Sequence, residues 1–129
     1  MASQDAPRGP EYLTITLTGR APVRIRREDW PIVASARHRD GEVPSRSLWD
    51  YSLTVRQHGD GRAVVYGVYA SAAPGEHDVR GGAVVPADGN LAAAIRQVAA
   101  DMAAADPEAA SVWARLGREA TADLPAEYI

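Results

Sequence analysis

The chain has 129 residues, the size of one domain, and a chain of this length buries about two-thirds of its unfolded surface. It contains no cysteine, which excludes disulfide frameworks and thiolate metal sites, and no apolar run approaches the roughly 18 residues of a membrane span. All 14 basic residues are arginines, and with 17 acidic residues the net charge is −3, far from the dense basic stripe of a duplex-binding protein.

The charge is uneven along the chain. Residues 1–82 hold 11 arginines and 10 acidic residues, a net of +1, whereas residues 83–129 hold 3 arginines and 7 acidic residues, a net of −4. The segment 20–62 holds 9 arginines and 6 acidic residues, a net of +3. The positive bias of this segment is mild.

Residues 1–10 are polar and rich in small side chains, for which we predict a disordered tail. Residues 11–129 are expected to form a single α+β domain. The first ten residues lack the hydrophobic core of a signal peptide. Together with the missing cysteines, this predicts a soluble cytoplasmic protein.

A half-buried strand is predicted at residues 12–18, where leucine and isoleucine alternate with threonine. After a turn at residues 19–22, an extended segment alternates Val23 and Ile25 with arginines. The next signal is for a short helix from Trp30 to about Arg37. Two carboxylates precede it, where they complement a helix N-terminus, and a proline suits its first turn.

A charged loop is predicted from Arg37 to Ser47, and a β-hairpin follows at residues 48–70. Apolar and polar residues alternate through the first strand of the hairpin, with a period of two. Residues 59–61 (Gly-Asp-Gly) suit a tight turn, since glycine tolerates the positive φ of such turns. Residues 62–70 supply a second strand rich in valine and tyrosine.

A third strand is predicted at residues 79–85, although Gly81 and Gly82 weaken it. Asn90 is expected to cap an alanine-rich helix. The apolar face of that helix would be formed by Leu91, Ile95, Val98 and Met102. Asp106 is expected to cap a last helix, which Gly117 kinks or ends. The buried stripe of the last helix would be Val112, Trp113 and Leu116.

These elements predict an α+β fold, with an antiparallel sheet of three to five strands and two or three helices packed on one face. The sheet would contain residues 12–18, 48–58 and 62–70. Its apolar face toward the helices would carry Leu13, Ile15, Leu17, Val23, Ile25, Trp49, Tyr51, Leu53 and Val55. Its solvated face, with either Tyr66 or Tyr69, would carry Thr14, Thr16, Thr18, Arg24, Arg26, Ser52, Thr54 and Arg56.

A flat face of threonine, arginine and tyrosine suits an acidic protein surface or a nucleic-acid backbone, because arginine forks to carboxylates and phosphates. The alternative is a solvated face without function, since antiparallel sheets often leave one face wet. The candidate binding residues are Arg24, Arg26, Arg56, Thr16 and Thr54 on this face, and Arg37 and Arg39 in the charged loop.

The sequence offers little for catalysis. His38, His58 and His77 are expected in solvated loops, and a weak metal site at His38 and His77 is the less favoured alternative. No serine sits in a Gly-x-Ser-x-Gly elbow, and no glycine-rich loop has the lysine of a P-loop. We therefore expect no enzymatic activity, no cofactor and no metal.

Five blocks of the chain resemble a family of small, mostly uncharacterised proteins carried by plasmids and phages. The blocks are Thr16–Val23 (TLTGRAPV), Asp29–Ala36 (DWPIVASA), Val55–Arg62 (VRQHGDGR), Val65–Tyr69 (VYGVY) and Asp123–Glu127 (DLPAE). The resemblance extends from about residue 12 to residue 129 and supplies no catalytic residue. It implies an accessory role on a mobile element, with antagonism of a host defence complex, as by anti-CRISPR proteins, as the favoured form.

Two classes of function follow. The first is a protein-binding inhibitor of a host nucleoprotein complex such as CRISPR-Cas. The second is a nucleic-acid-binding accessory or regulatory protein that uses the same basic face. The acidic C-terminal third favours the first, since it can contact arginine-lined nucleic-acid channels in a partner. We thus expect a protein partner and no membrane.

Overall fold

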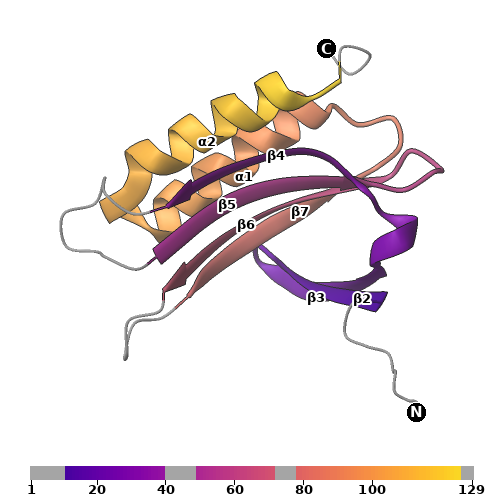
Figure 1. Ribbon diagram of the computed structural model, residues 1–129, viewed down its shortest axis with the longest axis horizontal. Coiled ribbons are helices and arrows are strands. Elements are labelled where there is room, and N and C mark those ends of the chain that lie inside the picture. The colour runs from indigo at the N-terminus through magenta and orange to yellow at the C-terminus, as the bar shows by residue number, and fades with distance from the viewer. Residues whose placement is uncertain (1–10, 40–48, 72–77, 126–129) are drawn as a thin grey trace.

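Three layers stack in this fold, in the order helices, four-stranded sheet and two-stranded hairpin (Figure 1). The computed structural model describes residues 11–39, 49–71 and 78–125, so the predicted tail at residues 1–10 lies outside the described residues. The elements are β2 (Tyr12–Leu17), β3 (Arg20–Arg26), the 3-10 turn η2 (Arg27–Asp29), β4 (Ile32–Arg39), β5 (Trp49–Gln57), β6 (Ala63–Ser71), β7 (Val79–Val85), α1 (Leu91–Ala105), the 3-10 turn η3 (Pro107–Ala109) and α2 (Ala110–Asp123). This arrangement confirms the predicted α+β fold.

The four-stranded sheet is antiparallel, with its strands in the order β4-β5-β6-β7. Its centre is the predicted hairpin, in which β5 pairs with β6 along its whole length. The His58 amide closes the turn by donating to the Arg62 carbonyl at 2.8 Å, and Gly61 has a positive φ of 99°. The third predicted strand is also confirmed, as β7.

The short helix predicted from Trp30 to Arg37 is wrong, because Ile32–Arg39 form the edge strand β4. Ala34 and Ala36 are buried while Ser35 and Arg37 are exposed, which is the period of a strand that pairs with β5. The carboxylates that suggested a helix start form only the 3-10 turn η2. The predicted charged loop begins inside this strand, and residues 40–47 lie outside the described residues.

Both helices pack on one face of the four-stranded sheet (Figure 1). The predicted apolar face of α1 is confirmed, and the Asn90 side chain caps the helix by accepting a hydrogen bond from the Ala93 amide at 2.9 Å. The layer between helices and sheet is apolar. Its largest fully buried side chains are Trp113, Tyr51, Tyr69, Leu53, Ile95, Met102 and Leu116.

Two details of α2 differ from the prediction. Asp106 does not cap the helix; its buried carboxylate accepts a hydrogen bond from Nε1 of Trp113 at 3.0 Å, and α2 begins after the turn η3. Gly117 does not end the helix, which continues to Asp123. A Cβ atom at Gly117 would lie 2.9 Å from Cβ of Ala99, so the glycine allows α2 to approach α1 closely.

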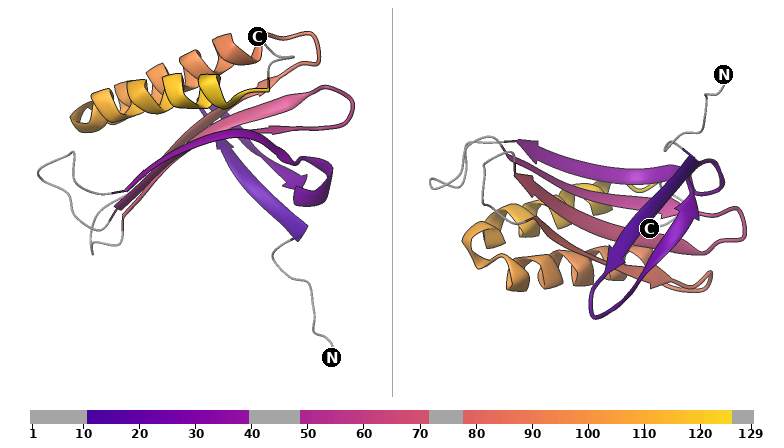
Figure 2. Two further views of the ribbon diagram at one scale, coloured as in Figure 1. Left: turned by 45° about the horizontal axis from the view of Figure 1, so that its top comes forward. Right: turned by 90° about the horizontal axis from the view of Figure 1, so that it is seen from below.

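The strands β2 and β3 form a separate hairpin, so the prediction that residues 12–18 join the main sheet is wrong. This β2–β3 hairpin crosses the face of the sheet opposite the helices (Figure 2). Its apolar side packs on the sheet rather than on the helices. The buried cluster between the two layers is Ile15, Leu17, Ile25 and Val64.

Glycines in β7 allow the hairpin to come this close to the sheet. The Gly82 carbonyl accepts from the Thr18 amide at 2.9 Å, and the Gly82 amide donates to Oγ1 of Thr18 at 3.1 Å. A Cβ atom at Gly82 would lie 2.7 Å from the carbonyl oxygen of Val65 and 3.0 Å from that of Thr16. The glycine that weakens the strand signal therefore makes room for the contact between the layers.

Candidate functional site

The predicted binding residues do not share one face. Those on the exposed outer side of the β2–β3 hairpin are Thr16, Arg24 and Arg26. Arg37 is exposed on β4 rather than in a loop, and its guanidinium forms an ion pair with Asp50 of β5. Arg39 is the last residue of β4, and its side chain lies outside the described residues.

Thr54 and Arg56 are buried, so the prediction that they are solvated is wrong. Thr54 is 9% exposed and Arg56 is 8% exposed, because the hairpin and the Trp30 segment that follows it lie over this side of the sheet. Nε of Arg56 donates to the Tyr66 hydroxyl at 2.9 Å, and Nη1 donates to the Trp30 carbonyl at 3.1 Å. Tyr66 thus lies on this face, and Tyr69 lies in the core under the helices.

The outer side of the β2–β3 hairpin forms a polar surface. We call it the hairpin face, and it consists of Tyr12, Thr14, Thr16, Arg24 and Arg26, all of them exposed. The Arg24 guanidinium lies over the Tyr12 ring at 4.4 Å, which holds the arginine against its neighbour strand. Arg26 pairs with Glu28 at 2.9 Å, and because both side chains are largely exposed this ion pair contributes little to stability.

A second group of polar and aromatic side chains gathers where the chain leaves the hairpin and meets the β5–β6 turn. We call it the Trp30 corner, and it consists of Trp30, Arg56, His58, Asp60, Arg62 and Tyr66. The His58 and Trp30 ring centroids are 5.1 Å apart, and the Arg62 guanidinium lies over the Trp30 ring at 5.3 Å. Asp60 links Arg62 to His58. Its Oδ2 accepts from Nε of Arg62 at 2.8 Å, and its amide donates to Nδ1 of His58 at 3.1 Å.

The environment of Asp60 favours its ionised form. The Arg62 amide donates to Oδ1 at 3.0 Å and lowers the pKa of the Asp60 carboxyl below its ordinary value, and the Arg62 guanidinium acts in the same direction. Since Nδ1 of His58 accepts the Asp60 amide, the neutral imidazole carries its proton on Nε2. The turn is therefore held by charge as well as by its glycines.

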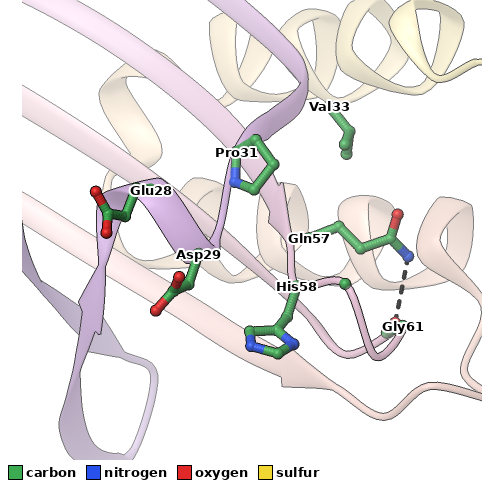
Figure 3. A pocket seen from close by; sticks show the side chains of 8 residues that line it. Glu28, Asp29, Pro31, Val33, Gln57, His58 and Gly61 are labelled. Carbon is green, nitrogen blue, oxygen red and sulfur yellow. Dashed lines mark hydrogen bonds between the residues drawn. The ribbon is translucent and has the colours of Figure 1, made fainter.

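An open pocket of about 670 Å³ borders the Trp30 corner (Figure 3). Its lining residues are Glu28, Asp29, Pro31, Val33, Gln57, His58, Gly59 and Gly61. Figure 3 shows Gln57 directed at Gly61, whose carbonyl accepts its hydrogen bond at 3.2 Å. None of the described lining residues is a serine, threonine or cysteine, the side chains that a histidine base activates as nucleophiles. Among the described residues, no three or more His, Cys, Asp or Glu side chains are grouped to hold a metal ion.

The histidines depart in part from the loop positions predicted for them. His38 lies within β4, half-buried, with its ring centroid 6.1 Å from that of Tyr51. His58 lies at the predicted turn but is also half-buried. His77 lies outside the described residues, so the alternative of a metal site shared with His38 stays a prediction.

Five members of the Trp30 corner are absent from the predicted binding site: Trp30, His58, Asp60, Arg62 and Tyr66. The register of the β5–β6 hairpin contains a signal for one of them. Thr54 pairs with Tyr66, which places Arg56 diagonal to Tyr66 on the same face. No local pattern brings Trp30 to Arg56, because the hydrogen bond between them joins residues 26 positions apart.

Comparison of the chain with protein-family models, with curated proteins and with solved structures finds no match. The resemblance to plasmid and phage proteins thus stays a prediction. Three of its blocks, Asp29–Ala36, Val55–Arg62 and Val65–Tyr69, meet at the Trp30 corner. No helix in the described part of the chain is long and apolar enough to cross a membrane.

Proposed function

We propose that this chain is a non-catalytic interaction protein, which binds an acidic protein surface through the hairpin face. The supporting observation is that this face presents two arginines beside a tyrosine and two threonines on a paired, hydrogen-bonded backbone. Arginine recognises carboxylates through two parallel hydrogen bonds, and tyrosine adds contact area at low conformational cost. The cation–π contact of Arg24 with Tyr12 reduces the freedom that binding would otherwise remove.

The finer form of the proposal is a mobile-element protein that acts in the cytoplasm of its host. It inhibits a nucleoprotein defence complex, such as a CRISPR-Cas complex, by binding one of its proteins. Two features favour this form. One is the resemblance to plasmid and phage proteins, and the other is the net charge of −4 over residues 83–129, which suits an arginine-lined nucleic-acid channel.

A non-catalytic role agrees with the chemistry of the pocket beside the Trp30 corner. Nδ1 of His58 lies 3.1 Å from Oδ1 of Asp60, but it accepts the Asp60 amide and so does not donate to this carboxylate as the histidine of a catalytic triad does. Among the described lining residues there is also no serine, threonine or cysteine for the imidazole to activate. The pair instead stabilises the turn that contacts Trp30.

The second candidate is a nucleic-acid-binding accessory protein that uses the same hairpin. The observation that favours it is the concentration of exposed arginines in and directly after β3: Arg20, Arg24, Arg26 and Arg27. Arginines spaced along a strand contact phosphates without sequence specificity. Such binding would weaken steeply with salt, whereas binding to a protein through a few carboxylates would weaken less.

The test is capture of partners from a host lysate, with and without nuclease, by the wild-type chain and by Arg24→Glu/Arg26→Glu. A matched control is Arg96→Glu/Arg118→Glu, which makes the same charge change on the exposed side of α1 and α2. Both variants should melt close to wild type, because an exposed substitution costs about 0.5 kcal/mol or less. The hairpin-face variant should bind the captured protein at least about 30-fold more weakly, and the control should bind normally.

Each result has one meaning. A protein that survives nuclease treatment and is lost only with the hairpin-face variant supports the proposal. A partner that disappears with nuclease supports the nucleic-acid alternative. Equal binding by the hairpin-face variant and the wild type would contradict both, because both place the contact on this face.

A further inference from the structure

Arg56 is a buried cation with no counter-ion among the described residues. Its side chain is 8% exposed, and its two hydrogen-bond acceptors are neutral oxygens, the Tyr66 phenol and the Trp30 carbonyl. No carboxylate of the described residues forms an ion pair with it. Because arginine stays protonated in proteins, a positive charge that no carboxylate of the described residues pairs with lies beneath the surface at this point.

The same group retains unused donors. Nε and Nη1 of Arg56 each make one hydrogen bond, whereas Nη2 makes none within the described residues. The Tyr66 hydroxyl accepts from Nε, and its own proton has no acceptor in the described part of the chain. Nε and Nη2 are bonded to the same carbon, so the hydroxyl proton and Nη2 are neighbouring donors.

We infer that Arg56 and Tyr66 form a binding site for an oxyanion, and that its occupant is a carboxylate of an acidic segment of the partner protein. The anion would accept from Nη2 of Arg56 and from the Tyr66 hydroxyl, and it would supply the missing negative charge. The guanidinium is already held in place by Tyr66 and Trp30, so binding costs little side-chain entropy. A charge pair in such a desolvated position is stronger than an exposed one.

The limited exposure of Arg56 favours a carboxylate side chain over a nucleic-acid phosphodiester as the source of the oxyanion. With 8% of Arg56 exposed, an aspartate or glutamate side chain, which is thin and ends in a planar carboxylate, can reach Nη2. A phosphodiester has a sugar on either side, which keeps its oxygens from a recessed donor. Arg62, the other arginine of the Trp30 corner, already has a carboxylate partner in Asp60. This leaves Arg56 as the anchor.

The test titrates the isolated chain with acetate and, separately, with dimethyl phosphate, replacing chloride at constant ionic strength. The readout is the NMR signal of the Arg56 Nε–H group, which is protected by its hydrogen bond to Tyr66. We expect this signal to shift with acetate and to reach saturation, and to show no saturable shift with dimethyl phosphate. The internal control is Nε–H of Arg62, which Asp60 already occupies and which should not respond.

The matched variant is Tyr66→Phe, which keeps the ring in the hairpin-side cluster and removes the hydroxyl. Because that hydroxyl also accepts from Nε of Arg56, the titrations of wild type and variant are compared through the backbone amide signal of Arg56. It should weaken acetate binding about tenfold, since one hydrogen bond to a charged group is lost. Absence of a saturable acetate shift in the folded wild type would overturn the inference. Tighter binding of dimethyl phosphate than of acetate would overturn the choice of a carboxylate. Equal acetate affinity of wild type and Tyr66→Phe would overturn the role of Tyr66.

This inference rests on the proposed function, because it names the chemistry by which the acidic partner is recognised, yet the two can fail separately. The acetate titration needs no partner, whereas the capture experiment reports on the hairpin face. Acetate binding at Arg56 with no effect of Arg24→Glu/Arg26→Glu on capture would support the oxyanion site and contradict the hairpin face as the contact surface. Loss of capture by Arg24→Glu/Arg26→Glu without acetate binding at Arg56 would support the hairpin face as the contact surface. It would also show that Arg56 is a structural link between the layers.

Discussion

The two faces of the main sheet are covered in different ways. On one face, α1 and α2 enclose a large apolar cluster, with Trp113 and Tyr51 fully buried at its centre. On the other face, the β2–β3 hairpin encloses a small apolar cluster and leaves Thr54 and Arg56 buried beside it. The helix side thus provides most of the apolar burial, and the hairpin side carries the polar chemistry. Polar positions became interior because a hairpin, rather than solvent, covers them.

The strongest way to test this contrast is to truncate the centre of the helix side. Trp113→Ala should lower the free energy of unfolding by about 3–5 kcal/mol, because it removes a fully buried ring and a buried hydrogen bond to the Asp106 carboxylate. Urea unfolding measures this loss. Ile15→Ala, in the hairpin-side cluster, should cost less. A loss for Ile15→Ala as large as that for Trp113→Ala would contradict the contrast.

A second variant separates the two layers without touching the helices. Gly82→Ala places a Cβ atom 3.0 Å from the carbonyl oxygen of Thr16 in the hairpin and 2.7 Å from that of Val65 in the sheet. Backbone atoms cannot rotate away, so the variant should cost about 1–3 kcal/mol. Amide exchange at Thr18, which donates to Gly82, should accelerate more than exchange in α1. The matched control is Gly59→Ala, since no atom lies within 4 Å of a Cβ there. Uniform acceleration in both layers would show that they unfold together.

The contribution of the Arg56 charge to stability can be measured separately from that of its long side chain. Arg56→Met keeps a long flexible stem, removes the buried charge, and should change the free energy of unfolding by less than about 1 kcal/mol. The small effect is expected because the lost hydrogen bonds to Tyr66 and Trp30 are offset by the relief of desolvation. Thermal and urea melts measure it. A loss above about 3 kcal/mol would mean that Arg56 holds the layers together through its hydrogen bonds.

The smallest effect concerns pH and the β5–β6 turn. The pKa of Asp60 is lowered in the folded chain, so its contribution to stability is fully present above its unfolded pKa of about 4. That contribution is lost as the pH falls through the lower folded value. Asp60→Asn should therefore lower the melting midpoint slightly at pH 7 and flatten the acid side of a plot of melting midpoint against pH. An unchanged slope below pH 4 would contradict the assignment.

Patterns within single elements determined much of this fold. The β5–β6 hairpin follows from strict alternation around a glycine-containing turn, and α1 follows from a helical apolar stripe behind the Asn90 cap. These signals act between residues close in the chain, where backbone geometry and side-chain period are coupled. The same patterns identified which residues share a face. They placed Arg24 and Arg26 on an exposed polar side, as the structure does.

Only the tertiary structure decided what covers each face. Alternation is the same for a strand under solvent and for one under a hairpin, so the sequence pattern could not distinguish an exposed Arg56 from a buried one. The docking of the β2–β3 hairpin depends on contacts between distant segments, such as Thr18 with Gly82 and Arg56 with Trp30. The Trp30 corner exists because these long-range contacts form, and no local preference encodes them.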